Sequence, residues 1–239
     1  MNNTYYNQQT TVSTQGAFAA QVYGWMTLGI VITAVIAFII DLVTSRSSEL
    51  LYLITILSLP AIIIQLVLVL VLSFLWQKLN GFVALALFLI YSAFTGVTVG
   101  IIALNYSLNS IFLAFGISAI MFLILAAYGL ITKRDLSRWR AVALFALVGI
   151  ILVSIVNVVL LLLNSPLSNT LNALANYVIV IVFSVLIAAD SAQLKNLAHQ
   201  AELSGQGHTR YAVSGALMLY LDFINLFLSV LRITGSRRD

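Results

Sequence analysis

Seven long apolar runs, separated by short polar connections, dominate the pattern of this chain. The hydrocarbon core of a bilayer requires about 20 mostly apolar residues per spanning helix, because every backbone N–H and C=O must be bonded within the helix. Each run meets this requirement. The pattern therefore predicts an all-α membrane protein with seven transmembrane helices, which we place at residues 19–41, 51–75, 81–104, 108–132, 141–163, 171–199 and 210–234.

The residues before the first run are polar. Residues 1–18 are rich in Asn, Gln, Thr and Tyr and carry no charge, so we expect a short polar N-terminal tail. They lack the basic residues that begin a cleaved signal peptide. No linker or change of composition divides the rest of the chain, so residues 19–239 are predicted to form a single seven-helix transmembrane domain.

The composition agrees with a membrane protein. Of the 239 residues, 62% are hydrophobic and 8% are charged, whereas soluble domains have about 25% charged residues. The formal net charge is +4, but the basic residues lie at the ends of the apolar runs. We therefore expect the lipid bilayer, and not nucleic acid, as a partner. The absence of Cys excludes disulfides, thiolate metal sites and a Cys nucleophile.

The distribution of Lys and Arg predicts the orientation, because basic residues favour cytoplasmic connections. With a cytoplasmic N-terminus, the outer connections carry only Arg46, and the inner ones carry Lys78, Lys133, Arg134, Arg138, Arg140, Lys195 and Arg210. Seven spans then place the C-terminus outside, although Arg237 and Arg238 lie there. A last helix that enters and returns would place these arginines inside, and this second topology stays open.

Two acidic residues lie inside predicted helices, where an ionisable group costs at least about 2.5 kcal/mol at the helix centre. Asp190 lies 15 residues before Gly205, in the turn between the last two helices, and Asp222 lies 17 residues after it. At about 1.5 Å per residue, the depths of the two carboxyls differ by roughly 3 Å. We therefore predict that Asp190 and Asp222 face each other.

Such a pair could act as a proton-controlled latch. A shared proton would hold the carboxyls together, whereas its loss would make them repel or recruit a divalent cation, and they would titrate as a unit. Carboxylate oxygens suit Ca²⁺, so Asp190 and Asp222 are also candidate calcium ligands. Asn225 shares a helix face with Asp222 and is a candidate for orienting its carboxyl. The alternative is that each Asp only hydrogen-bonds a neighbouring polar residue.

Missing residues exclude several catalytic classes. An intramembrane serine protease needs a His base within the bilayer, whereas His199 and His208 flank the predicted inner loop. No span has a mid-membrane Lys for a Schiff base, and neither a P-loop nor H-E-x-x-H occurs. The two aspartates also lack the Tyr-Asp and Gly-x-Gly-Asp contexts typical of aspartyl intramembrane proteases. We therefore expect no enzyme and no cofactor.

The last helix resembles that of a known family. Residues 215–232 (GALMLYLDFINLFLSVLR) are similar to the closing signature of the Bax inhibitor-1 family, also called the transmembrane Bax inhibitor motif family. The start of the first helix (VYGWMTLGI, 22–30), the loop after the fourth (TKRDLS, 132–137) and the end of the sixth (DSAQLK, 190–195) are similar too. The resemblance covers nearly the whole chain, and the short polar tail suggests a bacterial member.

This resemblance implies six helices around a central C-terminal helix and a pH-sensitive Ca²⁺ leak. Asp190 and Asp222 match the pH-sensing pair of such relatives. Some relatives add an arginine at the cytoplasmic end of helix 2 that exchanges with the pair; here that stretch reads FLWQK, so Lys78 is the candidate. Ala189 replaces a tyrosine that commonly precedes the helix 6 aspartate. Arg232 is a candidate interfacial anchor or pore charge.

The prediction for function is a proton-modulated cation leak in a bacterial inner membrane, with Ca²⁺ as the expected ion. The alternative from another class is a non-conducting interaction protein that modulates a membrane protease or a stress response. The polar segment from Met1 to Gln15 would be its binding segment. A third possibility is a secondary transporter that uses the same carboxyls as a proton relay.

Overall fold

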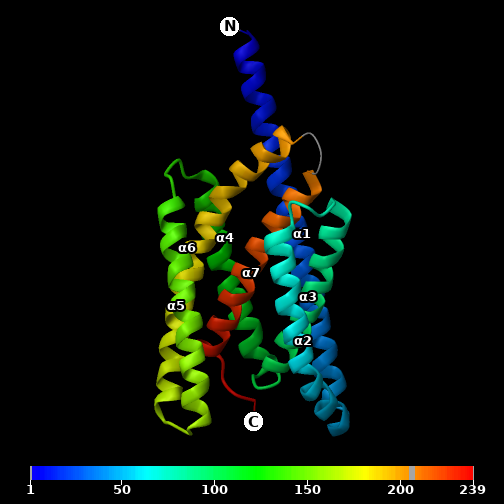
Figure 1. Ribbon diagram of the computed structural model, residues 1–239, viewed down its shortest axis with the longest axis vertical. Helices are drawn as coiled ribbons and strands as arrows, with labels where there is room; N and C mark the ends of the chain where they lie inside the picture. The colour runs from blue at the N-terminus through cyan, green and yellow to red at the C-terminus, as the bar shows by residue number, and fades with distance from the viewer. Residues whose placement is uncertain (1, 205–207, 239) are drawn as a thin grey trace. The chain divides into compact units, whose positions relative to one another are not determined.

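The computed structural model describes residues 2–204 and 208–238, and these residues form seven helices (Figure 1). The helices are α1 (Asn2–Thr44), α2 (Ser48–Leu75), α3 (Gly81–Ala103), α4 (Leu108–Ile131), α5 (Ser137–Leu162), α6 (Leu167–Leu203) and α7 (His208–Thr234). All seven are long and apolar enough to cross a membrane. The prediction of an all-helical protein with seven membrane-spanning helices is confirmed.

Several helices extend beyond their predicted limits. The first helix begins at Asn2, so the backbone of the predicted polar tail is helical, and the apolar part begins at Gln15. α5 begins at Ser137 instead of residue 141, and α6 covers Leu167–Leu203 instead of 171–199. The apolar pattern locates the part of a helix that faces lipid. It misses the polar turns at either end, where backbone bonding continues.

Polar side chains fix where two of the helices start. Asn80 Oδ1 accepts a hydrogen bond from the Val83 N–H at the start of α3, at 2.8 Å. Ser107 Oγ accepts from the Ser110 N–H at the start of α4, at 3.3 Å. These bonds satisfy backbone donors that the first turn of a helix leaves without an intrahelical partner.

The chain folds as two compact units, and two helices contribute to both of them. Unit 1 consists of Met1–Asn105 and Leu194–Tyr220, and unit 2 consists of Tyr106–Gln193 and Leu221–Asp239. Unit 1 therefore holds α1, α2 and α3, the end of α6 and the first part of α7. Unit 2 holds α4, α5, most of α6 and the last part of α7.

In unit 1, α1 and α3 approach each other closely. A Cβ added at Gly96 of α3 would lie 2.7 Å from Ile36 Cβ and 2.9 Å from the Thr33 carbonyl oxygen of α1. A glycine at this position therefore sets the helix spacing, as small residues commonly do in membrane interfaces.

Buried polar side chains link the helices of unit 1. Thr33 Oγ1 donates to the Ser92 carbonyl oxygen at 3.0 Å and shares a 2.6 Å hydrogen bond with the Tyr220 hydroxyl. Gln65 of α2 donates through Nε2 to Thr95 Oγ1 of α3, at 2.8 Å. α1, α2 and α7 are each joined to another helix in this way.

Unit 2 is held by a close helix contact and an aromatic cluster. A Cβ at Gly129 of α4 would collide with the Ala188 carbonyl oxygen of α6, so this glycine brings the two helices together. Phe223 of α7 packs edge-on against Phe115 and Phe122 of α4, with ring centroids 5.6 and 5.7 Å apart. After α7, the Ser236 N–H donates to Ser110 Oγ at 3.0 Å, which fixes the chain end to the start of α4.

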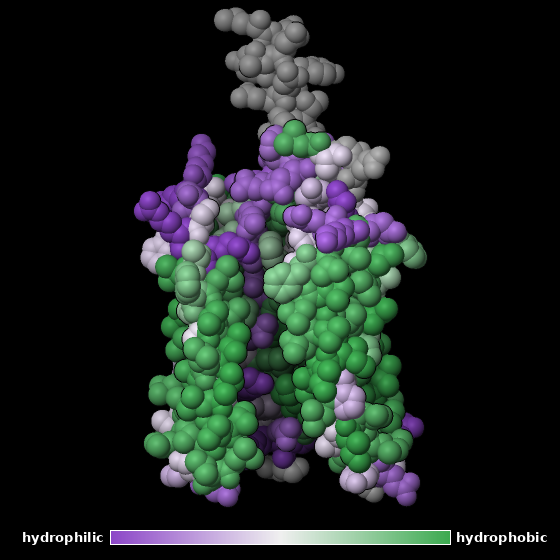
Figure 2. Space-filling model, in the orientation of Figure 1, coloured by the Kyte–Doolittle hydropathy of each residue, from purple (hydrophilic) through white to green (hydrophobic). Residues whose placement is uncertain are grey.

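Apolar side chains cover the middle of the helices in each unit, and hydrophilic ones gather at the helix ends (Figure 2). Of the seven candidate spans, α7 has the largest buried share, 67% against 39% for α3, which comes next. α7 also runs without a break from His208 to Thr234, so the alternative of a last helix that enters and returns finds no support.

Candidate pH-sensing site

Asp190 and Asp222 both belong to unit 2, where α6 supplies the first and α7 the second. Both side chains are buried, with exposed fractions of 3% and 4% for the two residues. Their carboxyl groups are close enough to interact directly. The structure thus brings together the two acids that the sequence paired by depth and by family resemblance.

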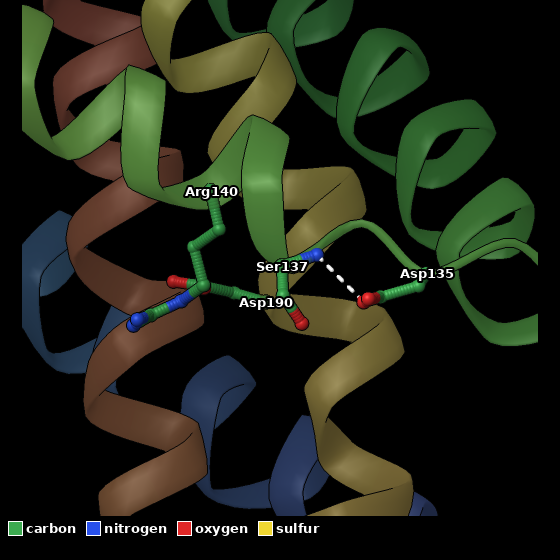
Figure 3. Close-up of polar contacts among 4 residues, drawn as sticks. All are labelled: Asp135, Ser137, Arg140 and Asp190. Atoms are coloured by element: carbon green, nitrogen blue, oxygen red, sulfur yellow. Dashed lines mark hydrogen bonds and ion pairs between the residues drawn. The ribbon is translucent and has the colours of Figure 1, made fainter.

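Arg140 completes this site, and sequence reasoning did not assign it there. Its Nε donates to Asp190 Oδ1 at 2.5 Å, and the two side chains meet between α5 and α6 (Figure 3). The Arg140 side chain is 29% exposed and that of Asp190 5%. The cation therefore reaches from the polar edge of unit 2 to a buried anion.

The position of Arg140 follows from the true start of α5. The sequence prediction placed Arg140 in a connection, one residue before a helix at 141. Because α5 begins at Ser137, Arg140 lies in the first helical turn instead. Asp190 consequently lies within reach of a side chain from that first turn.

Asp222 is the second buried acid of the site. It interacts with both Asp190 and Arg140. Its Oδ2 atom is buried and has no hydrogen-bond partner within residues 2–204 and 208–238. A carboxylate oxygen accepts hydrogen bonds when ionised and can carry a proton when neutral, so Oδ2 is an atom at which a proton or cation could be taken up.

Neighbouring residues hold the backbone around the two acids. Gly129 allows α4 to approach α6 at Ala188, two residues before Asp190. Phe223, which follows Asp222, is fixed by its ring contacts with Phe115 and Phe122. The carboxyls therefore project from well-packed segments of both helices.

The other candidate residues occupy different positions in the chain. Lys78 is exposed in the turn after α2 and belongs to unit 1. Asn225 is half-buried, and its Nδ2 donates to the Leu221 carbonyl oxygen of its own helix at 2.8 Å. Arg232 is exposed in the last turn of α7, a favourable place for a cation beside helix carbonyls.

A resident calcium centre would need ligands besides the carboxyls of Asp190 and Asp222. Protein sites give Ca²⁺ six to eight oxygen ligands. No group of three or more His, Asp or Glu side chains gathers anywhere in the described part of the chain. Asp190 and Asp222 could therefore contact a calcium ion in passage, but they do not form a full coordination shell by themselves.

One sequence signal could have pointed to Arg140. Two buried acids on adjacent helices require a nearby cation or a proton, because an unpaired buried charge is costly. Arg140 is the last of the four basic residues between the fourth and fifth runs, and so the one next to the membrane. Which of the four reaches the acids depends on helix rotation, and only the fold determines it.

Comparison with known proteins identifies the family. The family model described as "Inhibitor of apoptosis-promoting Bax1" matches residues 15–239. The chain belongs to the Bax inhibitor-1 family. The chain is 43% identical over 222 residues to the inner membrane protein YbhL of Escherichia coli strain K12. These residues cover 92% of each protein.

Two other relatives of this chain are covered at least as well but carry less informative names. An uncharacterized protein of Deinococcus radiodurans is 37% identical over 230 residues, with 96% of this chain and 95% of the relative covered. An uncharacterized protein of Borreliella burgdorferi is 36% identical over 225 residues, with 93% of each covered. The predicted family membership is confirmed. Together with the seven apolar helices, the relative named for the inner membrane supports a multi-pass inner-membrane protein.

Proposed function

We propose that this protein is a proton-controlled cation leak of the bacterial inner membrane, with Ca²⁺ as the permeating ion and a cytoplasmic N-terminus. It acts without enzymatic chemistry and without a cofactor. The observation that carries the proposal is the cluster of Arg140, Asp190 and Asp222, in which a single guanidinium serves two buried carboxyls.

The charge balance of this cluster depends on protons. Arg140 can neutralise one carboxylate, so the second must either hold a proton or remain an unpaired buried anion. An unpaired buried charge costs several kcal/mol. The groups that act on Asp190 are Arg140 and Asp222, so these three residues set which arrangement has the lowest free energy at a given pH.

Exchange of the guanidinium links this charge balance to helix packing. Asp190 holds Arg140 in the present arrangement. An ionised Asp222 competes for the same guanidinium, whereas a protonated Asp222 donates a hydrogen bond and does not compete. Because the three side chains come from α5, α6 and α7, a change of partner alters the contacts among three helices.

Carboxylate oxygens also explain the choice of ion. They are hard ligands that suit Ca²⁺, and Asp222 Oδ2 is a buried oxygen with no hydrogen-bond partner in the described residues. When both carboxyls are ionised, the cluster carries a net negative charge that attracts a divalent cation. Protons and calcium ions then compete for the same oxygens.

The direct test is Ca²⁺ flux into liposomes that contain the purified protein. It is measured from acidic to neutral conditions, between about pH 5 and 8. We expect Asp190→Asn and Asp222→Asn each to flatten the dependence of flux on pH. Asp135→Asn is the matched control, because Asp135 is an exposed acid in the preceding connection. Unchanged pH profiles in both buried variants would refute the proton-controlled latch.

The alternative is a non-conducting protein that modulates a membrane protease or a stress response. The observation that favours it is that α1 continues from Gln15, where the apolar span begins, back to Asn2. This extra helix offers a binding segment outside the apolar region. Deletion of Met1 to Gln15 discriminates between the two functions, because it should abolish partner binding while leaving flux intact.

A further inference from the structure

A groove runs along the surface of unit 2 between α4 and α6, and Arg140, Asp190 and Asp222 are not among the residues that line it. Its volume is about 610 Å³, within the roughly 300 to 1,000 Å³ range of small-molecule sites. Leu125 of α4 and Val180 and Ser184 of α6 line its walls. Ile181, at its edge, is 65% exposed, so the groove opens toward the surroundings of the helices.

The length of the groove matches one leaflet of a bilayer. Along α6 its lining residues extend from Val180 to Ala189. At about 1.5 Å per residue, this stretch is roughly 13 Å long, close to half of the hydrocarbon core of about 30 Å. An acyl chain from one leaflet would therefore fill it from end to end.

One end of the groove is cationic and aromatic. Arg134, Leu136 and Trp139, from the α4–α5 connection and the first turn of α5, also line it. Trp139 is 60% exposed, and tryptophans are enriched at membrane interfaces. The groove thus has a charged mouth and apolar walls, which is the polarity of an anionic amphiphile.

The surrounding connection reinforces this positive charge. Lys133 and Arg138 are exposed beside Arg134. Asp135 is the acid of this connection, and its Oδ1 accepts from the Ser137 N–H at 2.9 Å. Hydrogen bonds from the Ser137 side chain and backbone lower the pKa of Asp135, so it stays ionised at neutral pH. Together with Arg134, these residues give the mouth of the groove three cations and one anion, so its net charge is positive.

We propose that this groove is a binding site for an anionic phospholipid, with one acyl chain between α4 and α6 and the phosphate at Arg134. Basic pockets between transmembrane helices are suited to lipid head groups. The site stands on the groove and its charge, and it does not require that the protein conduct ions.

Trp139 provides a direct reporter of occupancy. In a Trp25→Phe, Trp76→Phe protein it is the remaining tryptophan. The reporter protein is reconstituted in phosphatidylcholine vesicles that contain a small, equal fraction of brominated phosphatidylglycerol or brominated phosphatidylcholine. Fluorescence quenching of Trp139 by the two brominated lipids is compared. We expect the anionic lipid to be enriched about fivefold at Trp139, because one interfacial cation attracts anionic lipid to about this extent.

Two variants separate a specific site from general surface charge. Arg134→Gln removes the cation at the mouth and should reduce the enrichment to near onefold. Arg138→Gln removes the same charge from the same connection, outside the groove lining, and should retain most of it. Ser184→Phe fills the groove and should also abolish the enrichment. Ser184 Oγ donates to the Val180 carbonyl oxygen of its own helix, at 2.7 Å.

Mass spectrometry of wild-type protein with bound phosphatidylglycerol provides a second measurement that needs no tryptophan substitutions. Adducts should be lost in Arg134→Gln and retained in Arg138→Gln. Equal enrichment of the two lipids, or equal losses in the two arginine variants, would overturn the proposal. Disulfide-linked dimers of an Ile181→Cys variant would also overturn the proposal, because they would identify a second copy of this chain as the occupant of the groove.

Discussion

At the scale of single residues, the site depends on how one guanidinium and two carboxyls divide their charge. Arg140 bonds Asp190, and the buried Asp222 interacts with both of them while its Oδ2 has no hydrogen-bond partner in the described residues. Arginine retains its charge at any physiological pH and offers five donors in a planar fork. Protons therefore act on this cluster through the two aspartates alone.

Loss of Arg140 should change both stability and pH response. Arg140→Gln leaves Asp190 buried without its cation, and breaking a buried pair costs about 3 to 5 kcal/mol. Because the Arg140 side chain is 29% exposed, we expect about 2 kcal/mol of destabilisation, measured by thermal unfolding in detergent. The midpoint of flux against pH should rise by about one pH unit, since loss of a nearby cation favours the neutral carboxyl.

Arg138→Gln is the control for this experiment, because it removes an exposed arginine two residues away. It should leave both the unfolding temperature and the flux midpoint unchanged. The double variant Arg140→Gln, Asp190→Asn should recover part of the lost stability, since neither partner is then left charged. A double variant as unstable as the sum of its parts would show that the two residues are not coupled.

At the scale of helices, spacing is set by glycine and by a few buried hydrogen bonds. Gly96 brings α3 against α1, and Gly129 brings α4 against α6. In a membrane, lipid is as apolar as the helix surface, so close packing and hydrogen bonds must select the contacts. These small residues therefore contribute more to specificity than the many large apolar side chains that face lipid.

Enlarging Gly96 should separate α1 from α3. Gly96→Leu would place a side chain where Ile36 and the Thr33 carbonyl oxygen already lie, and overpacking of this kind typically costs about 1 to 3 kcal/mol. Gly116→Leu in α4 is the matched control, because a Cβ there meets no atom within 4 Å. Unfolding temperatures should fall for the first variant and stay within experimental error for the second.

The Thr33 and Tyr220 hydroxyls should be coupled across α1 and α7. Each of Thr33→Val and Tyr220→Phe removes the 2.6 Å bond between them. Hydrogen bonds between membrane helices average about 0.6 kcal/mol in double-mutant cycles, and we expect a coupling of that size from the unfolding free energies of the two single variants and the double variant. A coupling near zero would mean that the bond adds no stability.

At the scale of the whole molecule, topology follows from seven helices and the basic connections. An odd number of spans places the two ends of the chain on opposite sides of the membrane. The cluster of basic residues between α4 and α5 favours a cytoplasmic location for that connection. The Arg140 site and the mouth of the proposed lipid groove would then both lie on the cytoplasmic side.

Cysteine labelling can test this orientation, because the natural chain contains no Cys. A membrane-impermeant thiol reagent applied to intact spheroplasts should label Ser45→Cys, between α1 and α2, and Arg238→Cys. Lys133→Cys, between α4 and α5, should react only after the membrane is permeabilised. Labelling of Lys133→Cys from outside, together with protection of Ser45→Cys, would reverse the proposed orientation.

The sequence determined the number and approximate positions of the helices, because length and apolarity are local properties that a bilayer reads directly. It also identified Asp190 and Asp222, since an acid within an apolar run is visible in one dimension and the rise per residue fixes its depth. The sequence of the last helix likewise indicated the family, because a signature motif is a local pattern of residues.

Only the tertiary structure decided how these helices face one another. Helices that are apolar on all sides carry little information about rotation, and rotation determines which side chains meet. That is why the bond between Arg140 and Asp190, the engagement of Asn225 with its own helix and the groove between α4 and α6 could not be predicted. Each depends on contacts between segments distant in sequence, which close packing selects and local pattern does not encode.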